Sequence, residues 1–233
     1  MTDLGKRFEK CQSYITSHVE RAKFGGKEAA KPSITISRQT GAGAITLGDH
    51  LAAFLNHETG GEQTEWAVFD KNLVKQVLED HDLPRRLEQY MPEDKPGAVG
   101  DAIADILGMH PPDWKLIEHT QSTIYRLAKI GHSILVGRGA NIITRDLPNV
   151  LHLRLIDSID RRIARCVSFY DISESQAREF IKKTDRGRRR YMLAYYDAEI
   201  DDPSTYDMVI NVERFSTQAL VQFIADMIPR WGQ

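Results

Sequence analysis

Hydrophobic positions along the chain follow two spacings, one typical of buried strands and the other of amphipathic helices. Short runs rich in β-branched residues predict five strands, at 33–37, 66–69, 133–137, 150–155 and 207–212. Apolar residues three and four apart predict helices at 43–56, 70–80, 112–130, 158–170, 173–192 and 216–228. Strands that alternate with helices are typical of a parallel sheet covered on both faces, so the sequence predicts a three-layer α/β fold.

Two segments depart from this alternation. Residues 3–23 carry an apolar stripe at helical spacing, and the following linker ends at Pro32, so 1–32 is predicted to be a helical appendage to a domain at 33–228. The helix would pack on the domain or on a second copy of the chain. Its polar face is mixed in charge rather than basic, which disfavours a membrane-surface role. Prolines and glycines break up residues 91–112, which we interpret as an irregular insertion.

Composition narrows the class of protein. The chain has 233 residues, is 41% hydrophobic and 27% charged, and carries a net charge of -2. These values are ordinary for a globular protein and exclude a strongly basic nucleic-acid binder, although not a local basic patch. Two widely spaced cysteines provide no disulfide or zinc framework. With neither a signal-peptide core nor an apolar run long enough for a membrane span, we expect a cytoplasmic protein.

A glycine loop follows the first strand and precedes a helix. Such a loop can hold a phosphate, because backbone amides and a helix N-terminus converge on the anion. A full phosphate loop reads Gly, four residues, then Gly-Lys-Ser/Thr. When this pattern is aligned on Gly43, Arg38 replaces the first glycine, Ala44 the lysine and Ile45 the hydroxyl residue. The loop therefore has the expected frame without its usual charged and metal-binding groups.

The polar residues of this loop have two interpretations each. Thr40 and Thr46 could contact a phosphate or cap the helix. Arg38 could replace the missing lysine or form a surface ion pair. The Gly-Ala-Gly sequence at 41–43 also occurs in tight turns that bind no ligand.

Charged residues also follow or begin other predicted strands. Arg138 stands between two glycines after the third strand, where its guanidinium could bind a phosphate through two hydrogen bonds or pair with a carboxylate. We favour the phosphate. Asp70 ends the second strand and Asp207 begins the last. Either could bind a nucleotide hydroxyl or a hydrated metal ion, or cap a turn.

A basic stretch at 154–190 holds eleven Lys and Arg residues against six acids. Arg162 and Arg165 share a helix face, and Arg186, Arg189 and Arg190 crowd a predicted helix end. Many of these side chains could simply be solvated, but a local excess of cations is also what polyphosphate binding requires.

Four segments together resemble the cytidylate kinase-like family, a branch of the P-loop nucleoside monophosphate kinases. They are 34–43, 69–71, 134–139 and 202–211, and the similarity spans about residues 33–225. The resemblance implies a five-stranded parallel sheet with a lid at about 171–200. It also implies ATP as donor, with Mg²⁺ as its usual companion, and a nucleoside monophosphate as acceptor.

The resemblance also suggests roles for single residues. Donor phosphates would lie on the loop, at Thr40, Gly41, Ala42, Gly43, Ala44 and Thr46. The acceptor would contact Asp70 and Arg138, although Gly139 replaces the aspartate that follows this arginine in the family. Arg38, Arg186, Arg189 and Arg190 would neutralise the charge of the transferring group. Arg162 and Arg165 would support the lid.

Two functions of different class follow from these observations. The first is transfer of the ATP γ-phosphoryl group to a nucleoside monophosphate such as CMP. The second is a regulatory protein that binds a nucleotide without turnover, which Ala44 and Ile45 favour. A weaker third alternative is a scaffold that associates through 3–23 and 91–112. We expect neither a nucleic-acid nor a membrane partner, and the sequence leaves a homo-oligomer open.

Overall fold

A five-stranded parallel sheet forms the centre of the protein. The computed structural model describes residues 31–58, 66–70, 114–137 and 139–228. Its strands are β1 (Ser33–Arg38), β2 (Ala67–Phe69), β3 (Ser133–Val136), β4 (Val150–Ile156) and β5 (Met208–Asn211). They lie in the order β2-β3-β1-β4-β5, and every adjacent pair is parallel. The predicted sheet is thus confirmed, with β1 at its centre.

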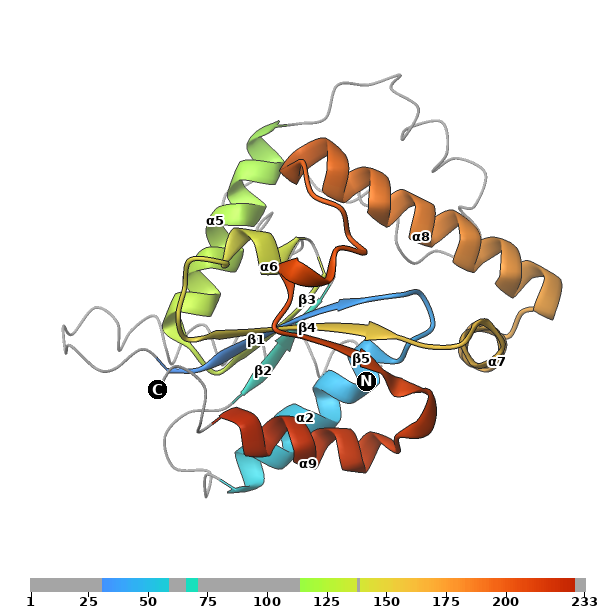
Figure 1. The fold of residues 1–233 in the computed structure, drawn as a ribbon, viewed down its shortest axis with the longest axis horizontal. Coiled ribbons are helices and arrows are strands. Elements are labelled where there is room, and N and C mark those ends of the chain that lie inside the picture. The colour runs from blue at the N-terminus through green and yellow to red at the C-terminus, as the bar shows by residue number, and fades with distance from the viewer. Residues whose placement is uncertain (1–30, 59–65, 71–113, 138, 229–233) are drawn as a thin grey trace, which may run out of the picture.

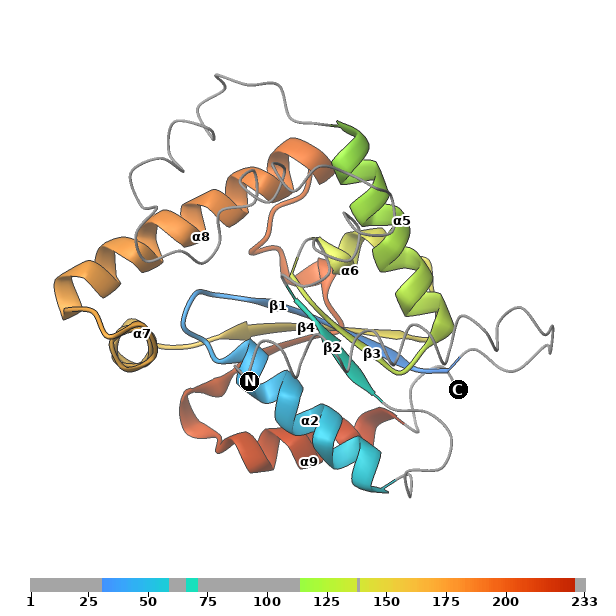
Figure 2. The ribbon, with the colours of Figure 1, turned by 180° about the vertical axis from the view of Figure 1, so that it is seen from behind.

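Helices cover both faces of the sheet. Helices α2 (Ala44–Glu58) and α9 (Thr217–Met227) pack together on one face. On the other face lie α5 (Trp114–Ile130), α6 (Ala140–Ile143) and α8 (Glu174–Tyr196), while α7 (Ile159–Tyr170) follows the carboxyl end of β4 (Figures 1 and 2). The 3₁₀ helices η2 (Pro203–Thr205) and η3 (Val212–Arg214) flank β5. The predicted helices at 3–23 and 70–80 and the insertion at 91–112 lie outside the described residues.

The two faces of β1 have different chemistry. Ile34 and Ile36 are fully buried in the hydrophobic core against α2 and α9. Ser33, Thr35 and Ser37 alternate with them and therefore face the opposite side, where they too are buried. This second face is therefore a polar layer beneath α6 and α8, and its buried hydroxyl groups need hydrogen-bonding partners.

Helices α7 and α8 are joined through a small core of their own, which includes Ile163, Cys166, Ala177 and Ile181. Ser173 begins α8 with a capping box in which its hydroxyl accepts from the Gln176 amide. The helix runs to Tyr196, four residues beyond the predicted end at 192. The prediction also missed α6, since four residues are too few to show a helical period.

Among the described residues, no helix has both the length and the apolar character needed to cross a membrane.

Candidate anion site at the carboxyl edge of the sheet

The loop between β1 and α2 turns through two glycines with left-handed backbone conformations. Gly41 has φ 79° and Gly43 has φ 81°, angles that other residues adopt only with strain. A Cβ on Gly41 would lie 2.6 Å from the Arg162 carbonyl oxygen, whereas the nearest atom to a Cβ on Gly43 would be the Arg165 Nε at 4.0 Å. Gly41 thus seats the loop against α7, and Gly43 borders open space.

This difference predicts unequal effects of adding one methyl group. Gly43→Ala should lower the free energy of unfolding by about 1–2 kcal/mol, the cost of a left-handed conformation. Gly41→Ala should cost more, because the loop must also move away from α7. Urea unfolding of both variants measures the difference, and equal losses would contradict the close packing of Gly41 on Arg162.

Several main-chain amides of the loop are available to a ligand. In the described part of the chain, no hydrogen bond within the protein uses the amides of Gly41, Gly43 or Ala44. The Ala42 amide instead donates to the Gln39 carbonyl over 3.1 Å. The side chain of Ala44, at the position of the usual lysine, is buried in the hydrophobic core. The loop therefore keeps main-chain amides that could bind a phosphate, but the residue at the lysine position belongs to the hydrophobic core.

Asp185 of α8 reaches this loop with its carboxylate. Its Oδ1 accepts from the Thr40 amide over 2.8 Å and from the Thr40 hydroxyl over 2.7 Å. Its Oδ2 forms an ion pair with Arg162, which is almost completely buried. A carboxylate from the protein therefore accepts hydrogen bonds from a loop that the sequence predicts to bind phosphate.

Two arginines of α7 hold the loop by its carbonyl groups. Arg162 Nε donates to the Thr40 carbonyl over 2.7 Å, and Arg165 Nη1 donates to the Gly41 carbonyl over 2.9 Å. Arg165 also pairs with Asp157, whose carboxylate is buried. These contacts tie α7 to the glycine loop and keep the charge of both arginines beside it.

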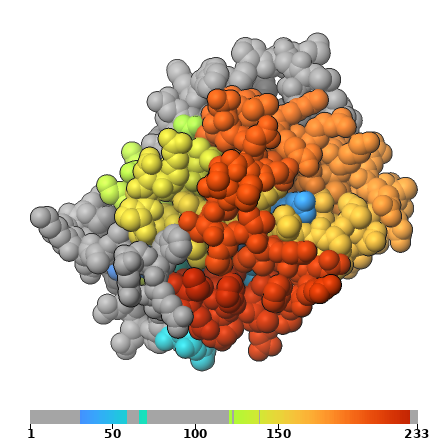
Figure 3. Space-filling view, in the orientation of Figure 1, coloured from blue at the N-terminus to red at the C-terminus, as the bar shows by residue number. Residues whose placement is uncertain are grey.

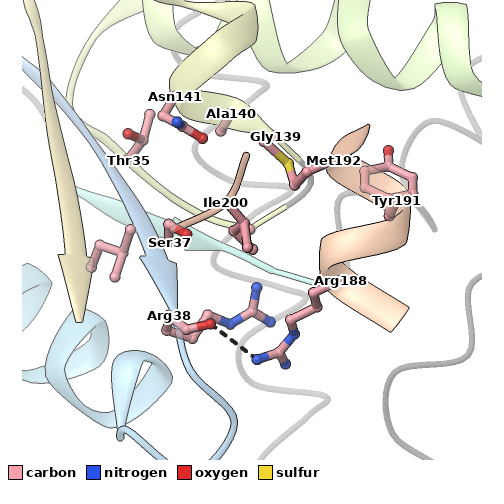
Figure 4. Close-up of a pocket in the computed structure, with 12 residues that line it drawn as sticks. Thr35, Ser37, Arg38, Gly139, Ala140, Asn141, Arg188, Tyr191, Met192 and Ile200 are labelled. Carbon is pink, nitrogen blue, oxygen red and sulfur yellow. Dashed lines mark hydrogen bonds between the residues drawn. The ribbon is translucent and has the colours of Figure 1, made fainter. Parts of the chain in front are cut away.

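A pocket opens between β1, the start of α6 and α8. Arg38 and Arg188 both line it, and Arg188 Nη1 donates to the Arg38 carbonyl over 3.2 Å (Figure 4). Figure 4 shows the two guanidinium groups at the same side of the pocket, with Thr35 and Asn141 at the other side and Met192 on α8. Its volume of about 30 Å³ is room for only a few water molecules. A larger ligand would therefore require α8 to shift.

A smaller recess beside this pocket is still more basic. It is lined by Arg38, Gln39, Arg154, Asp185, Arg188, Arg189 and Ile200. Arg154 is buried and donates to the Ser37 hydroxyl over 2.9 Å and to Asp201. Although partial burial raises the pKa of Asp201, hydrogen bonds from Arg189 and Arg154 hold it below its ordinary value.

The polar layer beneath the pocket continues into β4. Thr35 Oγ1 lies 2.8 Å from His152 Nδ1, and the His152 amide donates to Asp207 over 2.7 Å. Burial lowers the pKa of His152, partly offset by the charge of Asp207. Asp207 precedes β5 and binds the backbone of β4, so it is not at the carboxyl edge where a ligand would bind.

The structure brings together only part of the predicted set. The loop itself contains Thr40, Gly41 and Gly43. Arg162 and Arg165 bind its carbonyl groups, and Arg38 and Arg189 border the adjoining recess. Thr46 is exposed in the first turn of α2, and Asp70 is buried after β2 and does not line the pocket. Arg186 and Arg190 are exposed on α8. Arg138 lies outside the described residues. The functional roles of all these residues remain predictions.

Asp185 and Arg188 were missed as site residues. They continue the inward face of α8, which Ala177, Ile181 and Met192 define by their burial at spacings of three and four. That apolar spacing was visible in the sequence and would have singled out both residues. In Figure 3 the blue β1–α2 segment reaches the surface beside the gold and orange chain of α7 and α8.

The observed groups suit an anion with several phosphates. Among the described residues, the unused amides of the loop and a cluster of arginines converge at the carboxyl end of β1, where parallel α/β sheets bind their ligands. A family model described as the cytidylate kinase-like family matches residues 33–214. The chain belongs to the cytidylate kinase-like family.

Three solved structures are similar to this cytidylate kinase-like chain. One is an uncharacterized protein from Eubacterium ventriosum, 20% identical, with a TM-score of 0.62 over 85% of this chain and 99% of that one. A shikimate kinase from Bacteroides thetaiotaomicron is 15% identical, with a TM-score of 0.47 over 85% and 98%. Another, from Acinetobacter baumannii in complex with shikimate, is 13% identical, with a TM-score of 0.45 over 86% and 94%. No curated protein matches the chain. At 20% identity, the Eubacterium ventriosum structure supports the fold alone.

Proposed function

We propose that the protein transfers the γ-phosphoryl group of ATP to a nucleoside monophosphate such as CMP. The observation that carries this proposal is the arginine-lined recess beside the glycine loop at the carboxyl end of β1. Family membership, over residues 33–214, supports a nucleotide kinase-like protein. Phosphoryl transfer needs positioned groups and neutralised charge rather than an elaborate catalytic apparatus, and this recess offers both.

In the proposed reaction the bond between the γ-phosphorus and the bridging oxygen of ATP breaks, and ADP leaves with its electron pair. A new bond forms between that phosphorus and a phosphate oxygen of the acceptor. This oxygen is already anionic, so no general base is strictly required. The amides of Gly41 and Gly43 would hold donor phosphates, and the acceptor would enter the pocket lined by Arg38 and Arg188.

Mg²⁺ would enter as the MgATP complex. The two carboxylates closest to the loop, Asp157 and Asp185, are both paired with arginines. The metal would therefore be held chiefly by the phosphates, as is common for this cation, where it would neutralise charge on the transferring group. Thr46, exposed on the first turn of α2, is a hydroxyl that could assist in place of Ile45.

The second candidate is a regulatory protein of the same fold that binds nucleotide without turnover. It is favoured by the burial of Ala44, which leaves the loop without the usual lysine, and by the carboxylate of Asp185 on Thr40. Losing one preorganised donor can cost about 10²–10³ in rate, so turnover depends on how well the arginines replace it.

A phosphotransfer panel distinguishes these two functions. The full chain is incubated with MgATP and CMP, dCMP, UMP, AMP or GMP, and both ADP and the nucleoside diphosphate are measured. We expect saturable formation of one nucleoside diphosphate in equal amount to ADP. Calorimetry in parallel measures ATP binding. Tight ATP binding without transfer to any acceptor would reject the kinase and support the regulatory protein.

A further inference from the structure

Asp185 makes the contacts of a bound anion. Its carboxylate accepts from the amide and the hydroxyl of Thr40 and pairs with the buried Arg162. A phosphate oxygen would use the same three donors. Arg188 Nη1 lies 3.9 Å from Asp185 Oδ1, which adds a second guanidinium on the α8 side. The central ion pair is largely buried: the Arg162 side chain is 8% exposed and that of Asp185 is 15% exposed.

We propose that the Asp185 carboxylate is an internal competitor for the phosphate loop, which a polyphosphate must displace in order to bind. The nature of this anion rests on the proposed function, whereas the competition rests on the contacts of Asp185 alone. Two anions cannot share one set of donors without strong repulsion, so the carboxylate and a phosphate exclude each other at Thr40.

The burial of Arg162 makes the exchange favourable only when an anion is present. If the carboxylate leaves without a replacement, the buried Arg162 keeps its charge with no anion beside it and with the neutral Thr40 carbonyl as its acceptor. A polyphosphate restores that partner and adds contacts to the unused amides of Gly41 and Gly43. In the absence of ligand, α8 therefore holds the loop through Asp185, and binding of a polyphosphate releases this contact.

The substitution Asp185→Asn tests this inference through binding of inorganic tripolyphosphate to the full chain. We expect about tenfold tighter binding by calorimetry, the factor expected when one competing charged hydrogen bond is removed. Without ligand the variant should melt at a lower temperature than the parent protein, because Arg162 loses its partner. Tripolyphosphate should raise its Tm by more than it raises that of the parent.

Asp160→Asn is the matched control. Asp160 also bridges α7 and α8, through a pair with Arg178 at 3.8 Å, but it is exposed and this pair does not involve the loop. Its tripolyphosphate affinity should equal that of the parent protein. Asp185→Glu provides a second variant that keeps a negative charge for Arg162. Its carboxylate is one methylene further out and should bond Thr40 less well, so we expect affinity between those of the parent and Asp185→Asn.

Equal or weaker tripolyphosphate binding by folded Asp185→Asn would overturn the inference. If that variant does not fold, weaker binding by Asp185→Glu than by the parent would do so. Neither assay involves phosphoryl transfer. A chain that shows the predicted competition but transfers no phosphate therefore rejects only the proposed kinase, and an active kinase without the competition rejects only the internal competitor.

Discussion

Arg38→Ala should lower kcat for phosphoryl transfer by about 10²–10³, the loss typical of removing one preorganised charged donor. Arg38 ends β1, the central strand, and lines both the pocket and the basic recess. Its guanidinium also packs against Gly137, where an added Cβ would lie 2.0 Å from Nη1. This close packing holds the charge at the point where donor and acceptor would meet. Steady-state kinetics with the preferred nucleoside monophosphate measure the effect.

Arg178→Ala is the control for this prediction, because Arg178 is an exposed arginine of α8 that pairs with Asp160. Its kcat should match that of the parent protein. A change in ATP affinity alone in Arg38→Ala, with kcat preserved, would mean that Arg38 binds the donor without acting on the transferring group. The proposed role of this arginine would then be wrong.

Arg154→Ala should reduce the free energy of unfolding by about 1.5–3 kcal/mol, as expected when a buried donor of charged hydrogen bonds is removed. The Arg154 side chain is 4% exposed and is held by Ser37 and Asp201. Its guanidinium carbon also lies 5.7 Å from the centre of the Tyr206 ring. Removal leaves a cavity in the polar layer and deprives Ser37 of a donor and Asp201 of the more buried of its two arginines. Urea denaturation monitored by circular dichroism measures the loss.

Arg189→Ala is a stringent control because Arg189 pairs with the same carboxylate, Asp201, from an exposed position. Exposed ion pairs contribute little, so we expect a loss below about 1 kcal/mol. Similar losses in the two variants would contradict the view that burial makes Arg154 the structural partner of Asp201.

Much of the architecture could be predicted from periodicity. The alternation of Ile34 and Ile36 with Ser33, Thr35 and Ser37 already distinguishes two faces of the first strand. The glycine loop was located correctly, since a strand, two glycines and a helix are adjacent in the chain. By contrast, the partners of the polar face, His152 and Arg154, lie more than 110 residues away. No local pattern connects residues that far apart.

The basic stretch shows most clearly where sequence reasoning was insufficient. Its charge excess was visible, but the prediction selected Arg186, Arg189 and Arg190 for the site. The described structure turns Asp185 and Arg188 toward the loop, keeps Arg189 at the adjoining recess, and leaves Arg186 and Arg190 exposed. Neighbouring residues on a helix differ by about 100° in direction, so a shift of one or two positions exchanges a buried contact for solvent. Helix phase relative to another element depends on packing rather than on charge.

The sequence by itself determined the strands, the main helices, the position of the glycine loop and the local excess of arginine, because each depends on residues close together in the chain. The order of the strands, the polar layer beneath the pocket and the carboxylate of Asp185 on Thr40 were decided only by the tertiary structure. These features join side chains that are far apart in sequence, and they arise when buried groups must find hydrogen-bonding partners among whatever elements the packing brings near.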